Sequence, residues 1–189
     1  MEKAVVVITG GPGFGKTQII EKLAESGFWI GGEHARDLMN EQVKNGGDLL
    51  PWKNIKAFQQ EVLKRRVCFY NSVEPGELAF SDRGIPDQLA FARYRGFSDH
   101  EILLKKAKKY RYFPLVFITS PWKDIYQQDE VRKESFVEAC RIHDVVCETY
   151  EDLGYQLVDL PKDSIEERVT FITNHITKLN DEFIKKKFF

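Results

Sequence analysis

The sequence predicts an α/β fold in which a five-stranded parallel sheet carries helices on both faces. Five short apolar segments alternate with longer segments whose apolar residues recur at helical spacing, and this alternation is typical of βα units. Most of the short segments are apolar on both sides, as strands covered by helices from both faces must be. They lie at residues 4–8, 28–30, 77–81, 114–119 and 155–160. A glycine-rich turn follows the first strand, and with right-handed crossovers we expect that strand at the centre of the order 2-3-1-4-5.

The turn after the first strand has the spacing of a phosphate-binding loop, G-x-x-x-x-G-K-[ST], over residues 10–17. Its glycines remove side chains, so that successive N–H groups can point at one anion. Lys16 then supplies a cation for the β and γ phosphates, and the Thr17 hydroxyl can ligate the accompanying Mg²⁺. Phe14 is bulky for such a loop, and we expect its side chain to point away from the phosphates. A bound ATP or other nucleoside triphosphate is expected to contact Gly10, Gly11, Pro12, Gly13, Phe14, Gly15, Lys16, Thr17 and Gln18.

Length and charge limit the other possibilities. The 189 residues suit one well-buried nucleotide-binding domain, which we place at residues 1–182, followed by a basic and aromatic tail at 183–189. With 28 Lys and Arg against 29 Asp and Glu, the net charge of −1 offers no overall field for nucleic acid or an acidic membrane surface. No segment approaches 18 apolar residues, and no charged-then-apolar leader follows Met1. We therefore expect a cytoplasmic protein without nucleic-acid or membrane partners. The sequence indicates no oligomeric state.

An acidic residue, Asp82, follows the apolar strand 77–81 directly. The carboxyl ends of parallel strands meet at one edge of a sheet, so Asp82 is expected near the phosphate loop. There it could hold Mg²⁺ or accept a proton from an attacking hydroxyl as a catalytic base. Arg83 could neutralise phosphate charge, and Asp87 could contact the acceptor. The alternative for either aspartate is to cap the helix that begins near Pro86.

Two further charged groups are less clear-cut in the sequence. Glu33 and Arg36 lie one turn apart near the start of a helix expected from 33 to about 43, just past the end of the second strand. They could bind substrate at the sheet edge, or they could form a solvated ion pair, and the sequence does not decide between the two. In the long helix expected from about 52 to 70, the basic run 64–66 reads as a solvated face.

The segment from Ser120 to Glu134 is polar and of mixed charge, and it connects a strand to a long helix. Such a connection is where a short lid over the phosphates is expected, with Arg132 as its best catalytic candidate. After the last strand, Pro161 and Lys162 lie in a turn at the same edge of the sheet, where a nucleotide base could rest.

The loop segment 6–16 resembles the opening of an adenylate kinase, although the other motifs of that family do not follow. Over most of its length the chain is more similar to a group of small P-loop predicted ATPases with an AAA-type domain, whose members resemble nicotinamide riboside kinase and other nucleoside and nucleotide kinases. By this resemblance Asp82 and Arg83 would be the base and the phosphate-contacting residue, and Arg132 would belong to the lid. The resemblance does not supply the acceptor. The segments that carry it are 33–36, 50–52, 82–87, 121–126, 129–132, 153–155 and 160–161.

Two functions remain in view. The first is a Mg²⁺-dependent phosphotransferase that carries the γ-phosphate of ATP to a small acceptor near Glu33, Arg36, Arg83 and Asp87. The second is a nucleotide-dependent switch that hydrolyses slowly and binds a protein or lipid partner. A guanine-reading NKxD motif is absent from the sequence, which disfavours the commonest form of the second function. The choice of ATP or GTP and the identity of the acceptor stay open.

Overall fold

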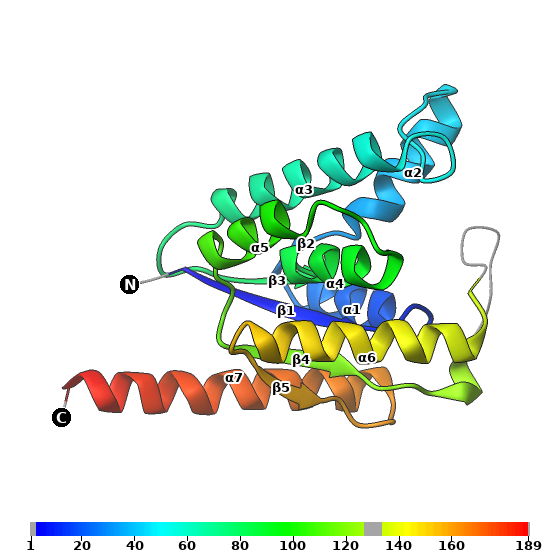
Figure 1. Ribbon diagram of the computed structural model, residues 1–189. Helices are drawn as coiled ribbons and strands as arrows, with labels where there is room; N and C mark the ends of the chain where they lie inside the picture. The colour runs from blue at the N-terminus through cyan, green and yellow to red at the C-terminus, as the bar shows by residue number, and fades with distance from the viewer. Residues whose placement is uncertain (1–2, 127–133, 189) are drawn as a thin grey trace.

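The computed structural model describes the backbone of residues 3–126 and 134–188, with side chains up to residue 177. Five parallel strands form one sheet in the order β2-β3-β1-β4-β5, which confirms the predicted topology (Figure 1). The strands are β1 (Ala4–Gly10), β2 (Trp29–Gly31), β3 (Leu78–Asp82), β4 (Leu115–Thr119) and β5 (Gln156–Asp159). The helices are α1 (Lys16–Glu25), α2 (His34–Asn45), α3 (Ile55–Ser72), α4 (Ile85–Arg95), α5 (His100–Lys109), α6 (Phe136–Asp152) and α7 (Ile165–Phe188), with a short 3₁₀ turn η1 (Lys123–Ile125).

The central strand β1 divides the core into two layers. Val5 and Val7 point into the layer covered by α3, α4, α5 and α6, whereas Val6 and Ile8 point into the layer covered by α1 and α7. This alternation follows from the two-residue period of a strand, and apolar residues at every position allow both faces to be covered. Because all five strands run parallel, the phosphate loop, Asp82 and the turn after β5 lie at the same edge of the sheet.

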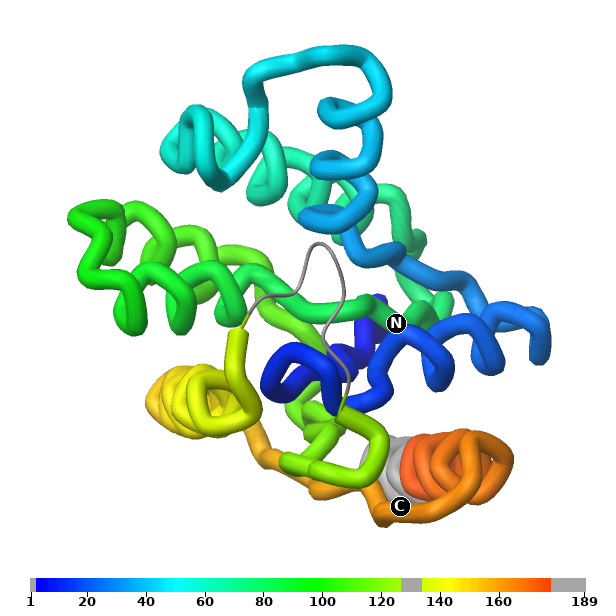
Figure 2. Tube along the Cα trace, turned by 90° about the vertical axis from the view of Figure 1, so that its right-hand side faces the viewer, coloured from blue at the N-terminus to red at the C-terminus, as the bar shows by residue number. Residues whose placement is uncertain are grey.

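Helices α2 and α3 form an arm beside the sheet edge. They pack on each other through a small core of their own, made by Leu38, Phe58 and Val62. Figure 2 shows this arm, in cyan, on one side of the dark-blue loop that follows β1, with α6 and α7 on the other side. The arm therefore forms one wall of the space next to the phosphate loop.

Two helix boundaries differ from the sequence-based expectation. Helix α3 begins at Ile55 rather than near Trp52, because the Asn54 side chain accepts a hydrogen bond from the Ala57 N–H at 3.1 Å and caps it there. Helix α7 continues to Phe188 instead of ending near Leu179, since no proline or glycine interrupts it. The division between a domain at 1–182 and a tail at 183–189 stays a prediction.

Within the described residues, no helix combines the length and the apolar character that crossing a membrane would require.

Candidate functional site

The phosphate loop joins β1 to α1 and adopts a conformation that depends on its glycines. Gly10, Gly13 and Gly15 all have positive φ, at 131°, 82° and 77°. A Cβ at Gly10 would lie 2.5 Å from the carbonyl oxygen of Thr119, so a larger residue would displace β4 as well as strain the backbone. The loop ends at Gly15, the residue that caps α1, and the helix therefore begins at the anion-binding position.

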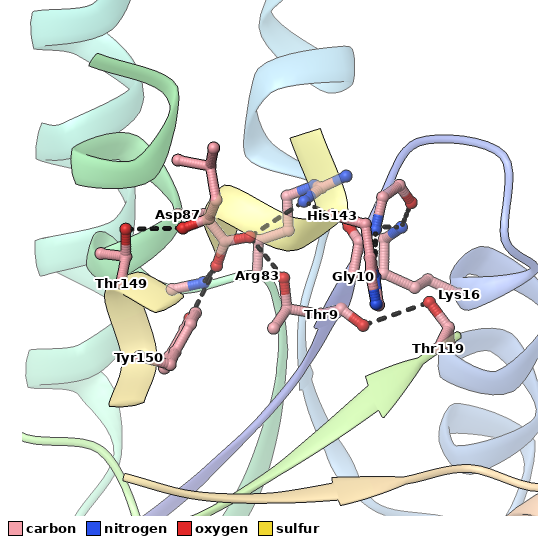
Figure 3. Close-up of polar contacts among 12 residues, drawn as sticks. Thr9, Gly10, Lys16, Arg83, Asp87, Thr119, His143, Thr149 and Tyr150 are labelled. Atoms are coloured by element: carbon pink, nitrogen blue, oxygen red, sulfur yellow. Dashed lines mark hydrogen bonds and ion pairs between the residues drawn. The ribbon is translucent and has the colours of Figure 1, made fainter. Parts of the chain in front are cut away.

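Lys16, the first residue of α1, is buried and turns back toward the loop. Its ammonium group donates to the carbonyl oxygen of Gly11 at 2.6 Å and lies 3.4 Å from that of Gly10 (Figure 3). Burial lowers the Lys16 pKa to about 7, and the nearby positive charge of Arg83 adds to this effect. Thr17 and Gln18, the next two residues, are exposed to solvent. The loop thus holds a desolvated amine, whose charged form a phosphate would stabilise.

Asp82 ends β3, paired in register with Ile8 on β1. Its carboxylate is buried, and Oδ1 has no hydrogen-bond partner in the part of the chain that the structure describes. Burial raises the Asp82 pKa to about 6, while attraction to Lys16 works in the opposite direction. An ionised carboxylate without a donor is costly in this position, so Oδ1 is suited to a cation or a proton that arrives with substrate.

Arg83 occupies a strained position next to Asp82. Its φ is 65°, the one positive value at a non-glycine residue among those described. The backbone N–H of Arg83 donates to Ile8 at 3.0 Å, and the guanidinium donates to Gly10 at 3.0 Å and to Asp87 at 2.9 Å. The strained backbone is held by these bonds, and it turns a cation toward the phosphate loop.

Asp87 has no exposed surface and serves the protein interior. Its carboxylate accepts hydrogen bonds from Arg83, from the Gly84 N–H at 2.7 Å, from the Tyr150 hydroxyl at 2.6 Å and from Thr9 (Figure 3). The bond to Gly84 caps α4, so the geometry favours the capping alternative. Both carboxylate oxygens of Asp87 already accept two hydrogen bonds from the protein, which argues against the predicted contact of Asp87 with an acceptor.

A cavity of about 760 Å³ opens beside the phosphate loop. Residues 12–18 of the loop line one side, and helices α2, α3 and α4 line the other. The wall away from the loop is largely aromatic and apolar, with polar groups set into it. Its members include Met39, Trp52, Ile55, Phe58, Val62, Arg66, Gln88, Phe91 and Phe97.

Glu33 and Arg36 lie on the wall of this cavity and also contact each other. Arg36 Nε is 3.1 Å from Glu33 Oε2, and both side chains are partly buried. Glu33 acts electrostatically on Lys16 and Asp82, which places its charge near the phosphate loop. Glu33 and Arg36 therefore form an ion pair and also line the cavity, so the two alternatives that the sequence left open, an ion pair or a substrate contact, do not exclude each other.

One residue of the basic run 64–66 contradicts the expectation of a solvated face. Lys64 and Arg65 lie on the surface side of α3, but Arg66 is only 4% exposed and lines the cavity. A sequence signal for this exists, since Arg66 falls four residues after Val62 and eight after Phe58, on the buried face of the helix. The two charged residues that precede Arg66, Lys64 and Arg65, made the whole run look solvated.

The ring of Phe14 is buried against helix α6 and the segment before it. It contacts the rings of Tyr126, Phe136 and His143, with centroids about 6 Å apart. His143 Nδ1 accepts a hydrogen bond from the Gly11 N–H at 3.4 Å and so ties the loop to α6. The bulky residue anchors the loop on the protein, in keeping with the expected direction of its side chain.

The remaining predicted residues lie farther from the cavity or beyond the described part of the chain. Pro161 and Lys162 follow β5 at the same edge of the sheet, with the Lys162 side chain exposed, and they do not line the cavity. Arg132 is outside the described residues. Asp124 and Glu134, on either side of that gap, do line the cavity.

Fold and loop together define a P-loop protein built on a five-stranded parallel sheet. The family model described as an AAA domain matches residues 5–168, and the chain belongs to that family. No curated protein matches the sequence.

Three solved structures illustrate the similarity of fold. Deoxyadenosine kinase from M. mycoides, with dCMP and dCDP bound, has a TM-score of 0.62 at 15% identity over 93% of this chain and 99% of its own. Thymidylate kinase from Candida albicans has a TM-score of 0.67 at 14% identity over 95% of this chain and 93% of its own. NadR in complex with NR has a TM-score of 0.68 at 17% identity, and the match covers 93% of this chain but only 50% of the NadR chain. At such identities these relatives establish the fold alone.

Proposed function

We propose that this protein transfers the γ-phosphoryl group of ATP to a small acceptor bound between the phosphate loop and the α2–α3 arm. The observation that carries the proposal is the cavity of about 760 Å³, which runs from the loop to an aromatic wall on α3 and α4. A protein that only hydrolysed nucleotide would have no need for a cavity with an aromatic wall next to the γ-phosphate position. The kinase fold of the related structures supports the same conclusion.

The loop and the two strand-end residues have separate parts in this reaction. Amide groups of residues 10–16 and the Lys16 ammonium bind the phosphates, and Arg83 neutralises charge between donor and acceptor. The acceptor oxygen forms a bond to the γ-phosphorus while the bond to the β–γ bridging oxygen breaks, and ADP leaves. Where the acceptor is a hydroxyl, its proton passes to the Asp82 carboxylate at the end of β3.

The site fits a divalent cation. Thr17 and Asp82 would hold Mg²⁺, which, when bound, would neutralise charge on the phosphate oxygens. The unpartnered Oδ1 of Asp82 supports this assignment. In the described part of the chain no group of three His, Cys, Asp or Glu could hold a metal unaided, and Mg²⁺ in such sites needs only one or two protein ligands.

The test begins with ligand identification. A thermal-shift screen of nucleosides, nucleotides and vitamins, with and without ATP·Mg²⁺, should reveal the acceptor, because a ligand of the folded state raises the melting temperature. ADP formation with the ligand found then measures turnover. Lys16→Ala should abolish nucleotide binding, whereas Asp82→Asn should spare binding and lower kcat by about 10²–10⁴-fold. Lys22→Ala, an exposed lysine on the same helix, is the matched control.

Two results would count against the proposal. Full activity of Asp82→Asn would remove Asp82 from its role. Steady phosphate release from ATP that no candidate acceptor changes would favour a nucleotide-dependent switch with a protein or lipid partner instead.

A further inference from the structure

The wall of the cavity holds a buried arginine whose charge the protein leaves unmatched. Arg66 is 4% exposed, and its Nε and Nη1 have no hydrogen-bond partner among the described residues. Burying a guanidinium without hydrogen bonds or a counter-charge is among the most costly arrangements in a protein interior. If only the stability of the fold mattered, a leucine or methionine would be expected at this position, which lies on the same face of α3 as Phe58 and Val62.

The groups around Arg66 do not supply the missing anion. Asp87 is the carboxylate that acts most strongly on it, but Asp87 is already paired with Arg83 at 2.9 Å and bonded to Tyr150. On the other side lies His34, whose pKa burial and the charges of Arg66 and Arg65 lower to about 4, so that it is neutral at pH 7. Both buried arginines interact with Asp87, but only Arg83 is hydrogen-bonded to it, so Arg66 lines the cavity without an ion pair of its own.

The same wall carries the features of a site for a planar ring. Phe58, Phe91 and Phe97 line it, and Trp52 stands at its rim with 64% of its surface exposed. Gln88 is held in place because its Nε2 donates to the side chain and backbone of Gln59, both at 2.9 Å, and its Oε1 has no partner among the described residues. A ring edge with an N–H or O–H donor would satisfy that oxygen.

From this arrangement we infer that the acceptor carries an anionic group, a phosphate or a carboxylate, attached to a planar ring, and that Arg66 is the residue that selects the anion. The inference rests on the proposed function and deepens it, because it distinguishes a charged acceptor from a neutral nucleoside. Arg66 is a binding residue in this account, and it takes no part in the transfer itself.

The experiment compares ligands with and without an anionic group. Each pair has a member with a phosphate or a carboxylate, here called anionic, and a member without it, here called neutral. Binding is measured by calorimetry in the presence of ADP·Mg²⁺, with each of AMP, GMP, UMP and dTMP paired against its own nucleoside. Nicotinic acid riboside, whose pyridinium ring carries a carboxylate, is paired against nicotinamide riboside, whose ring carries an uncharged amide, so that the carboxylate can be told from the phosphate. At least one anionic member should bind about tenfold or more tightly than its neutral partner, as expected for hydrogen bonds to a charged group.

Arg66→Met should remove this preference, weakening the anionic ligand about tenfold or more while changing the neutral one by less than about threefold. Arg66→Lys should keep part of it, because the charge remains without the planar fork. Arg65→Met, on the same helix but paired with Glu41 and Glu61 outside the cavity, is the matched control and should leave the preference intact.

Stability separates a ligand-binding arginine from a structural one. Without ligand, Arg66→Met should melt at the same temperature as the wild type or higher, because it removes a buried guanidinium whose Nε and Nη1 have no hydrogen-bond partner among the described residues. The inference is overturned if Arg66→Met melts several degrees lower with an unchanged ligand preference, or if no anionic ligand outbinds its neutral partner in a protein that binds ADP·Mg²⁺. Failure to bind ADP or ATP at all would instead refute the proposed function.

Discussion

At the scale of single residues, the site combines two desolvated groups of opposite charge. Burial lowers the Lys16 pKa to about 7 and raises the Asp82 pKa to about 6, so without nucleotide both groups titrate close to pH 7. Neither group has a protein partner strong enough to restore its ordinary pKa. Phosphates next to Lys16, and a cation next to Asp82, would restore both charged forms.

The lowered pKa of Lys16 predicts that the protein takes up a proton when nucleotide binds. Because burial lowers the Lys16 pKa to about 7, we expect the side chain to be largely neutral at pH 8 without nucleotide, and a bound polyphosphate to restore its charged form. Binding of ADP·Mg²⁺ should therefore take up a large fraction of one proton at pH 8, and affinity should fall as pH rises above about 7. Calorimetry in buffers of different ionisation enthalpy measures this uptake. Uptake near zero at pH 8 would mean that Lys16 is already charged in the empty site.

At the scale of elements, Asp87 ties together parts of the chain that are distant in sequence. It caps α4 through Gly84, binds β1 through Thr9 and binds α6 through Tyr150. Burial tends to raise the Asp87 pKa, but Arg83 and Arg66 outweigh it and hold the pKa below its usual value. The carboxylate thus fixes α4 and the neighbouring loop in one position, which a phosphate site requires.

Replacing Asp87 should destabilise the protein severely. Asp87→Ala leaves Arg83 buried without its carboxylate, and we expect a loss of about 3–5 kcal/mol in the free energy of unfolding, measured by urea denaturation at pH 7. Because the folded pKa is depressed, this contribution is present above about pH 4 and is lost as pH falls through the folded pKa. Asp152→Ala, which breaks an exposed ion pair with Arg93, should cost about 1 kcal/mol or less. Similar losses for the two variants would contradict the role given to Asp87.

At the scale of the whole molecule, the cavity exists because the α2–α3 arm stands over the edge of the sheet. The arm has its own small core of Leu38, Phe58 and Val62. Figure 2 shows the arm on one side of the phosphate loop. Through Leu63, Val67 and Phe69 of α3 the arm also packs on the layer that contains Val5 and Val7, so it is fixed over the sheet edge. Its rim residue Trp52 is then a natural reporter of ligand binding.

Ligands that fill the cavity should change the fluorescence of Trp52. With ADP·Mg²⁺ and an acceptor bound, its emission should shift to shorter wavelength and its quenching by acrylamide should fall, because its exposed surface becomes covered. Trp52→Phe should abolish these changes, whereas Trp29→Phe, in a strand away from the cavity, should preserve them. A signal that survives in Trp52→Phe would place the ligand elsewhere.

The sequence by itself determined the features that depend on residues close together along the chain. The spacing of residues 10–17, the apolar strands and the helical stripes are local patterns. Asp82 directly follows a predicted strand, and in a parallel sheet this position alone places it at the same edge as the phosphate loop. The strand order followed as well, because right-handed crossovers leave few alternatives once the loop strand is central.

Only the tertiary structure decided which charged groups are buried, and beside what. Asp87 and Tyr150 are 63 residues apart, and Gly11 and His143 are 132 apart, so no local pattern could join them. The burial of Arg66 depends on the packing of α3 over the sheet edge, and its lack of a partner depends on Arg83 having already taken the one carboxylate within reach. Charge and periodicity are properties of a segment, whereas the cost of a buried charge is set by every element that surrounds it.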